Sequence, residues 1–217
     1  MIIRSPKPVT LVGASVTSGT DFDQALAVGS LLVAADGGAE IALSRGVVPD
    51  AVIGDFDSLA DHVRERLPPD RLYHVPEQES TDFDKALRHI DAPLVLAVGF
   101  TGRRIDHELA TYNALARHAG RRTIVIGGHD ICFHLPAELE LELPVGTRLS
   151  LFPLTRMRCF SSGLTWPTEG LILDPIGRVG TSNSVASDTV VLRPDASGML
   201  VILPRSALGS AIRALLG

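Results

Sequence analysis

Residues 31–38 read Leu-Leu-Val-Ala-Ala-Asp-Gly-Gly, and residues 51–58 read Ala-Val-Ile-Gly-Asp-Phe-Asp-Ser. Each stretch begins as a short apolar run and ends in acidic residues beside glycine. Such runs are typical of strands buried on both faces of a parallel sheet. In open α/β sheets, ligands bind beyond the carboxyl ends of these strands. The two stretches therefore predict an α/β fold with polar groups collected at one edge of its sheet.

The same pattern continues through the first two thirds of the chain. Further strand-like runs occupy residues 9–12, 72–75, 94–98 and 123–126. Helical spacing of apolar residues appears between strands, at residues 23–28, 39–44, 60–66, 82–90 and 106–119. Strands and helices that alternate in this way indicate βαβ units. Residues 1–130 are therefore expected to form an α/β domain with a mostly parallel sheet.

The sequence pattern changes after about Gly128. Short strand-like runs then follow one another, at residues 131–135, 139–143, 148–154, 170–173, 189–192 and 199–203. Proline and glycine separate them, which predicts antiparallel strands joined by turns. Residues 181–184 are interpreted as a turn, and residues 206–216 as a short helix or a tail. Residues 131–217 are expected to form an antiparallel β-sandwich-like domain.

The composition limits the classes of function. The chain has 217 residues and a formal net charge of −5, so it lacks the broad basic surface that nucleic acids or anionic membranes attract. We therefore expect no nucleic-acid partner and no membrane partner. The sequence has no run of about 18 apolar residues and begins without a continuous apolar segment, which favours the cytoplasm. Cys132 and Cys159 lack metal-ligand spacing and are interpreted as free thiols.

Acidic residues at the predicted strand ends have the chemistry of a metal site. Asp55 and Asp57 follow one strand, and Asp82 lies in the loop after the next. Mg²⁺ prefers carboxylate oxygens together with phosphate oxygens and water. We therefore interpret the three aspartates as ligands of Mg²⁺. The alternative for Asp57 or Ser58 is a helix cap.

Neighbouring loops carry groups suited to a nucleotide. Asp36 and Gly37 follow a strand, and glycine there permits unusual torsion angles and close approach of backbone N–H groups to an anion. Thr81 is the expected N-cap of a helix. In that helix Lys85 lies one turn from Asp82, either as a phosphate contact or as a surface ion pair.

The loop that follows residues 94–98 joins glycines to two arginines. Arg104 can bind phosphate oxygens in a bidentate way, and Asp106 can orient Arg104 or cap the following helix. The loop is not a Walker A motif, because it lacks the Gly-Lys-Ser/Thr ending. His107 is interpreted as a helix-start residue.

Taken together, these motifs resemble the thiamine pyrophosphokinase family. The resemblance rests on Asp36-Gly37-Gly38-Ala39, Gly54-Asp55-Phe56-Asp57-Ser58, Ser80-Thr81-Asp82-Phe83-Asp84-Lys85-Ala86-Leu87, Gly102-Arg103-Arg104-Ile105-Asp106-His107, Gly163-Leu164-Thr165-Trp166 and Ser182-Asn183. It extends from about Val9 to Leu203. It implies an α/β domain that binds Mg-ATP, a β domain that helps to bind thiamine, and a homodimer with active sites between subunits.

The resemblance also implies roles for individual residues. The catalytic and metal-binding carboxylates are Asp55, Asp57 and Asp82. The nucleotide and phosphate contacts are Gln78, Thr81, Lys85, Arg104 and Asp106, to which the strand-end argument adds Asp36 and Gly37. The thiamine contacts are Trp166, Ser182 and Asn183, although a single tryptophan in a β domain is more often a core residue. The chain departs from the family pattern at Arg103, Thr111 and Ser184.

The implied activity is that of a transferase. It moves a diphosphate group from ATP to the hydroxyethyl group of thiamine, giving thiamine diphosphate and AMP, with Mg²⁺ as the cofactor. One alternative is a related diphosphokinase that acts on another hydroxymethyl acceptor, such as a pterin. Another is a non-catalytic regulator that binds a nucleotide or thiamine.

A homodimer is also expected from two C-terminal runs. Residues 171–173 and 189–192 carry apolar side chains on both sides. A strand buried on both faces needs cover on both faces. A second copy, packed through a two-fold axis, is the simplest source of that cover.

Overall fold

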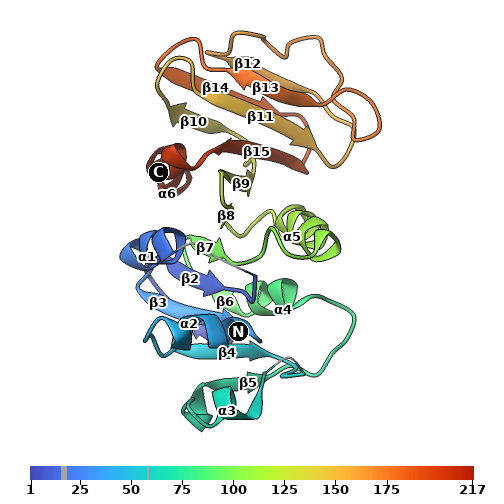
Figure 1. The fold of residues 1–217 in the computed structure, drawn as a ribbon. Coiled ribbons are helices and arrows are strands. Elements are labelled where there is room, and N and C mark those ends of the chain that lie inside the picture. The colour runs from blue at the N-terminus through green and yellow to red at the C-terminus, as the bar shows by residue number, and fades with distance from the viewer. Residues whose placement is uncertain (16–18, 58) are drawn as a thin grey trace. The chain divides into compact units, whose positions relative to one another are not determined.

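A computed structural model of the chain describes residues 1–15, 19–57 and 59–217. The chain separates into two compact units, which Figure 1 shows coloured from the N-terminus to the C-terminus. The first unit comprises residues 1–114 and 125–128, and the second comprises residues 115–124 and 129–217. Ser58, offered above as a helix cap, lies outside the described residues.

The first unit contains a parallel sheet. Its strands follow the order β7 (Val95–Val98), β2 (Val9–Val12), β3 (Leu31–Ala35), β4 (Ala51–Gly54) and β5 (Leu72–His74). The strand next to β7 is β8 (Thr123–Ile126), whose residues are divided between the two units. The pairs from β7 to β5 are all parallel. Every residue of β2, β4 and β7 is buried, as expected for strands that helices cover on both faces. A separate parallel pair joins β1 (Ile3–Arg4) to β6 (Ile90–Asp91).

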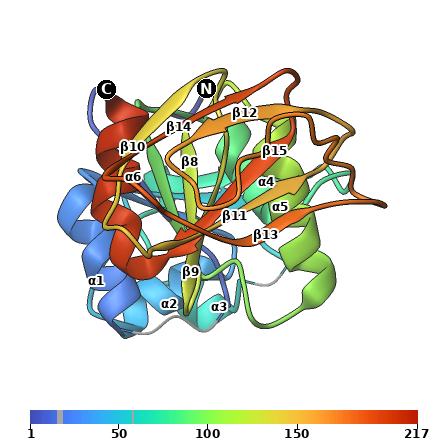
Figure 2. The same cartoon turned by 90° about the horizontal axis from the view of Figure 1, so that it is seen from above.

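Short helices connect these strands. They are α1 (Gly19–Val28), α2 (Gly38–Ser44), α3 (Asp61–Arg64), the 3-10 helix η1 (Pro69–Arg71), α4 (Asp82–Arg88) and α5 (Ile105–Arg117). Figures 1 and 2 both show α1 and α2 on one side of the parallel strands and α4 on the other. No helix among the described residues is both long enough and apolar enough to cross a membrane.

The antiparallel strands of the second unit form two hydrogen-bonded groups. One has the order β13 (Gly180–Ser184), β11 (Arg148–Pro153), β15 (Met199–Pro204) and β9 (Asp130–His134). The other has the order β10 (Leu139–Glu142), β14 (Thr189–Pro194) and β12 (Cys159–Ser162). In β10, buried leucines alternate with exposed glutamates, the pattern of a strand with one face on a core. The 3-10 helix η2 (Arg205–Ala207) leads into α6 (Leu208–Leu216), so residues 206–216 are helical rather than a tail.

The predicted fold class is confirmed, with three differences in the β part. Residues 170–173 form no strand, and only Leu173 makes an isolated bridge, with Met157. Residues 181–184 belong to β13 and are not a turn. The third difference is β12, which the sequence pattern did not predict. Both missed strands are short and rich in serine, so neither shows the apolar alternation by which strands are recognised.

The two C-terminal runs therefore do not support a homodimer in the way that their sequence pattern predicted. Residues 171–173 are not a strand. In β14, Val190 and Leu192 are buried, whereas Thr189 is exposed and Val191 is half-buried. This strand presents one buried face and one more open face, so it does not require a second cover. The expectation of a dimer then rests on the family resemblance alone.

Candidate functional site

Three carboxylates gather at the carboxyl ends of β3 and β4. Asp36 directly follows β3, and Asp55 and Asp57 follow β4. One oxygen atom from each side chain lies within 4.8 Å of the other two. Asp36 is only 1% exposed, whereas Asp57 is open to solvent. Because Mg²⁺ prefers oxygen ligands and often takes one or two carboxylates, this set of donors fits a magnesium ion.

The pairing of β3 with β4 explains why Asp36 joins the group. Ala35 lies opposite Ile53, so the next residues along the two strands, Asp36 and Gly54, are neighbours. A Cβ atom on Gly54 would lie 2.8 Å from the Cβ of Asp36. Glycine at this position therefore leaves room for the buried carboxylate.

The backbone is strained at two points of this group. Asp36 has a φ of 43° and Phe56 a φ of 64°, a region that costs a residue with a side chain about 1–3 kcal/mol. The Phe56 ring packs against His74, with centroids 5.6 Å apart, and the Arg64 guanidinium lies 5.9 Å from its centre. These contacts anchor the turn between Asp55 and Asp57.

Glycine acts differently here from what the sequence suggested. Gly37 has an ordinary φ of −57° at the N-cap of α2, so the prediction of unusual torsion angles at the glycines is wrong, and Asp36 takes that role. Gly38 is required for a different reason. A Cβ on Gly38 would lie 2.1 Å from the carbonyl oxygen of Val12, so only glycine lets α2 start against β2.

Lys85 connects the carboxylate group to Asp82. Its Nζ donates to Oδ2 of Asp55 at 2.7 Å and to Oδ1 of Asp82 at 3.5 Å. The side chain is 2% exposed, so the interpretation of Lys85 as part of a surface ion pair is wrong. Burial alone would lower the pKa of this amine. The hydrogen bond to Asp55 and the charges of both aspartates outweigh burial and hold the pKa of Lys85 above its ordinary value.

The two aspartates beside Lys85 respond in opposite ways. Burial opposes the charge of Asp55, but hydrogen bonds from Lys85, the Asp57 N–H and Gln78, together with the lysine charge, hold its pKa below the ordinary value. Burial is the main cause that raises the pKa of Asp82; the charge and hydrogen bond of Lys85 offset part of that rise, and the charges of Asp55 and Asp57 add to it. The charged form is thus favoured at Asp55 and disfavoured at Asp82 relative to a free aspartate, and further positive charge near Asp82 would favour its charged form. In the described part of the chain, Asp82 is not a member of the three-carboxylate group.

The start of α4 is held in place by side chains. Thr81 is the N-cap of α4, and its Oγ1 accepts a hydrogen bond from the Asp84 N–H at 3.4 Å, which confirms the predicted cap. Gln78 donates from Nε2 to Oδ2 of Asp55 at 2.8 Å. The predicted helix cap at Asp57 is not observed, because the N-cap of α3 is Ala60.

A second set of contacts, which no local sequence pattern indicates, holds the loop before α4. Arg88, the last residue of α4, donates to Glu77 and, at 3.0 Å, to Oγ of Ser80. Ser80 also donates to Glu77. The ion pair is partly exposed, so it adds little stability. Its effect is geometric, because it closes the loop that carries Gln78 onto the helix.

A cavity of about 720 Å³ opens beside these groups, and all of its lining residues belong to the first unit. This volume lies in the range of about 300–1,000 Å³ for small-molecule sites. Four residues predicted for the site line the cavity: Gly37, Thr81, Asp82 and Arg104. The carboxyl ends of β2, β3 and β7 surround it, which is where an open α/β sheet binds ligands.

Other lining residues were not singled out from the sequence as ligand contacts. They include residues 13–15, which follow β2, and Thr111 in α5. Gly13 is the one residue whose type could have indicated this part of the cavity. A Cβ on Gly13 would lie 2.5 Å from the carbonyl oxygen of Gly99, so glycine brings the loops after β2 and β7 together. The Thr111 hydroxyl is 2.9 Å from the His107 carbonyl, to which it donates.

The two arginines at the start of α5 have different partners. Arg104 donates from Nε and Nη2 to the two carboxylate oxygens of Asp106, at 3.2 and 2.6 Å. Asp106 thus orients Arg104, and it also accepts a hydrogen bond from the His107 N–H at 3.0 Å. Arg103 also lines the cavity, and its Nη1 donates to the carbonyl oxygen of Ala14 at 3.2 Å.

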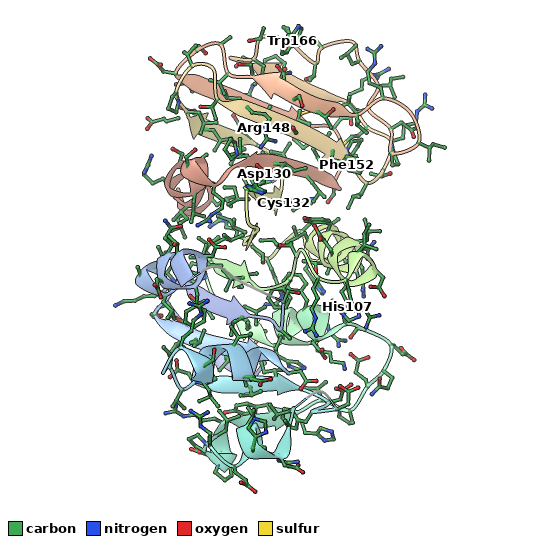
Figure 3. All side chains as sticks on the ribbon, viewed as in Figure 1. His107, Asp130, Cys132, Arg148, Phe152 and Trp166 are labelled. Carbon is green, nitrogen blue, oxygen red and sulfur yellow. The ribbon has the colours of Figure 1, made fainter. Side chains whose placement is uncertain are left out.

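In the second unit, Trp166 lies on the loop after β12, as Figure 3 shows, and is 60% exposed. The interpretation of Trp166 as a core residue is therefore wrong. Buried Asn183 holds its backbone: Nδ2 donates to the Trp166 carbonyl at 2.7 Å, and Oδ1 accepts from the Trp166 N–H at 3.2 Å. Exposed Ser182 has a φ of 59°, and its N–H donates to Oγ of Ser150 at 3.0 Å.

Carboxylates and a cavity beyond the strand ends are typical of α/β proteins that bind phosphate-containing small molecules. Comparison with known proteins narrows this class. The family described as "Thiamin pyrophosphokinase, catalytic domain" matches residues 22–126. Thiamine pyrophosphokinase 1 of Oryza sativa subsp. japonica is 27% identical over 166 residues, which cover 68% of this chain and 63% of the relative. Thiamin pyrophosphokinase 1 of Caenorhabditis elegans is 25% identical over 185 residues, covering 76% and 75%.

Solved structures share the fold. The thiamin pyrophosphokinase from Candida albicans superposes with a TM-score of 0.76 at 16% identity, covering 94% of this chain and 93% of that one. The enzyme of that name from Geobacillus thermodenitrificans gives 0.73 at 20% identity, covering 91% and 96%. Residues 22–126 of this chain are thus similar to the catalytic domain of thiamin pyrophosphokinases, and the chain shares its fold with solved proteins of that name. Its alignment nevertheless spans less than two thirds of the rice relative's length.

Proposed function

We propose that the protein transfers a diphosphate group from ATP to the hydroxyethyl group of thiamine, giving thiamine diphosphate and AMP. The observation that best supports this is the convergence of Asp36, Asp55 and Asp57 near a cavity, within the residues that the family matches. Transfer of a diphosphate needs charge neutralisation and in-line positioning more than covalent help. The proposed metal ligands are Asp55, Asp57 and Asp82, to which the geometry adds Asp36.

Each group of the site has a task in this reaction. Mg²⁺ bound to the carboxylates would neutralise the transferring diphosphate. Lys85 keeps Asp55 ionised, and together with Gln78 it fixes the position of that carboxylate. The hydroxyl oxygen of thiamine forms a bond to the β-phosphorus while the bond from that phosphorus to the AMP oxygen breaks, and the hydroxyl proton is released to solvent. The remaining proposed nucleotide contacts are Asp36, Gly37, Thr81, Arg104 and Asp106.

The acceptor is assigned to the second unit. Trp166, Ser182 and Asn183 are the proposed thiamine contacts. The exposed indole of Trp166 can stack on the cationic thiazolium ring of thiamine, an arrangement that a cation–π interaction stabilises. Asn183 would act by holding the Trp166 backbone. We also propose a homodimer, supported by the family resemblance, and a cytoplasmic location.

An acceptor panel tests the proposal. The purified protein is supplied with Mg-ATP and either thiamine, a hydroxymethylpterin or no acceptor, and AMP release is measured. We expect AMP only with thiamine. AMP release only with the pterin would show that the acceptor is a pterin and not thiamine. Thiamine binding without AMP release would favour a non-catalytic regulator over an enzyme.

A further inference from the structure

We propose that Arg103 is a second phosphate-binding arginine of the cavity, in addition to Arg104. This inference rests on the proposed function, because it takes the cavity to be the ATP site. It goes further by naming the residue of this chain that would add affinity for the polyphosphate part of the nucleotide.

The positive charge of Arg104 is already paired with a carboxylate. Its guanidinium makes two hydrogen bonds to the Asp106 carboxylate, at 3.2 and 2.6 Å. A bidentate pair of this kind offsets the positive charge and occupies donors on one edge of the guanidinium. Arg104 therefore offers a bound polyanion less net charge than a single arginine would.

Arg103 is differently placed. Its side chain lines the cavity, and the one hydrogen bond that the described residues give it runs from Nη1 to the carbonyl oxygen of Ala14, at 3.2 Å. No carboxylate of the described chain pairs with it. A guanidinium carries five N–H donors, so Arg103 keeps most of its donors and its full charge. Ala14 lines the same cavity, which fixes the guanidinium at the cavity wall.

The cavity also contains acidic side chains, which a nearby cation would offset. Glu40 and Asp82 are among its lining residues, and negative charge on either side chain opposes a bound polyphosphate. Arg103 opposes these charges without a carboxylate partner of its own. Because the Ala14 contact holds its guanidinium in place before a ligand arrives, less side-chain freedom is lost on binding. These features together favour a phosphate contact over a purely structural tie between two loops.

The test compares two ligands that differ only in phosphates. Affinities for ATP with Mg²⁺ and for adenosine are measured by calorimetry without thiamine, so no turnover occurs. The variants are Arg103→Met and Arg103→Lys, and the control is Arg122→Met, which removes an exposed arginine outside the cavity. We expect Arg103→Met to weaken ATP about tenfold, as loss of a charge-assisted hydrogen bond does, and to leave adenosine unchanged. The ATP affinity of Arg103→Lys should lie between those of the wild type and Arg103→Met. Lysine keeps the positive charge but lacks the planar guanidinium that could bind the Ala14 carbonyl and a phosphate at the same time.

Three results decide the matter. Equal losses for ATP and adenosine would assign Arg103 a structural role and overturn the inference. Unchanged ATP affinity in Arg103→Met would overturn it as well. The third result is that the Arg103 variants weaken ATP binding as expected while the wild-type protein releases no AMP with thiamine. That result would contradict the proposed function but would still support the inference.

Discussion

The carboxylate group of the first unit and the Trp166 loop of the second unit are held by different forces. Asp55 is fixed by a buried lysine at 2.7 Å, and removal of one partner from a buried ion pair leaves an uncompensated charge. Trp166 is fixed through its backbone by the neutral amide of Asn183, and its ring is exposed. Changes to the Lys85–Asp55 pair should therefore alter stability and chemistry together, whereas the indole can be removed with little structural effect.

The two regions nevertheless share one feature. The non-glycine residues with positive φ in the described chain are Asp36, Phe56 and Ser182. Each lies in a motif that the sequence assigned to ligand binding. Left-handed backbone persists only where the surroundings impose it, and it concentrates at functional sites. Strain therefore marks both regions, although only one of them contains a group of buried charges.

The largest expected effect is that of Lys85→Met on folding. The change leaves Asp55 and Asp82 close together without their shared cation, so the free energy of unfolding should fall by about 3 kcal/mol or more. Denaturant unfolding measures it. Lys7→Met is the matched control, because Lys7 is the other lysine of the chain and is exposed. A Lys85→Met protein as stable as the control would contradict the buried ion pair.

Asp57→Asn should act on the chemistry instead of the fold. It removes a proposed metal ligand that is exposed, so kcat should fall by about 10²-fold or more while the melting temperature is kept. Asp55→Asn and Asp82→Asn should lower kcat in the same way. Asp61→Asn, an exposed aspartate at the start of α3, is the control. The metal assignment fails if kcat of Asp57→Asn stays within about threefold of the wild type.

Trp166→Ala should separate the two regions most clearly. Loss of the exposed ring should raise the KM for thiamine about tenfold and leave the KM for ATP unchanged. The free energy of unfolding should change by only about 0.5 kcal/mol, as for other surface substitutions. Steady-state kinetics with each substrate varied in turn give both values. Equal increases in the two KM values would argue that Trp166 does not recognise the acceptor.

The smallest expected effect concerns acid stability in the second unit. Nε2 of His134 accepts a hydrogen bond from the Gly198 N–H at 3.0 Å, and burial lowers its pKa below the ordinary 6.5. The unfolded chain then takes up this proton first as the pH falls. The stabilising contribution is thus complete above pH 6.5 and is lost as the pH falls through the folded pKa.

His134→Gln removes the titration but keeps an acceptor for Gly198. We expect the free energy of unfolding to fall less between about pH 7 and pH 5 in this variant than in the wild type. Urea unfolding at a series of pH values measures the slope. Identical slopes would show that His134 does not titrate on unfolding.

The sequence predicted the parts of the site that depend on residue type at a strand end. Aspartates after short apolar runs identified Asp55 and Asp57, and a threonine three residues before Asp84 identified the cap of α4. The sequence could not supply what depends on register. Asp36 joins the carboxylates because Ala35 pairs with Ile53, and no local pattern encodes that pairing.

Long-range contacts were equally out of reach. Arg103 and Ala14 are 89 positions apart, and Lys85 is buried because Asp55, 30 positions away, meets it. In the second unit, β12 and β13 are rich in serine, so their pairing with neighbouring strands, rather than their own composition, makes them strands.

The central claim is that one step moves two phosphates to thiamine. Phosphorus NMR of the full chain with Mg-ATP and thiamine tests it most directly, because each phosphorus of products and substrates has its own resonance. Thiamine diphosphate and AMP should rise together in equal amounts from the first time point. Thiamine monophosphate with ADP as the first products would contradict the account.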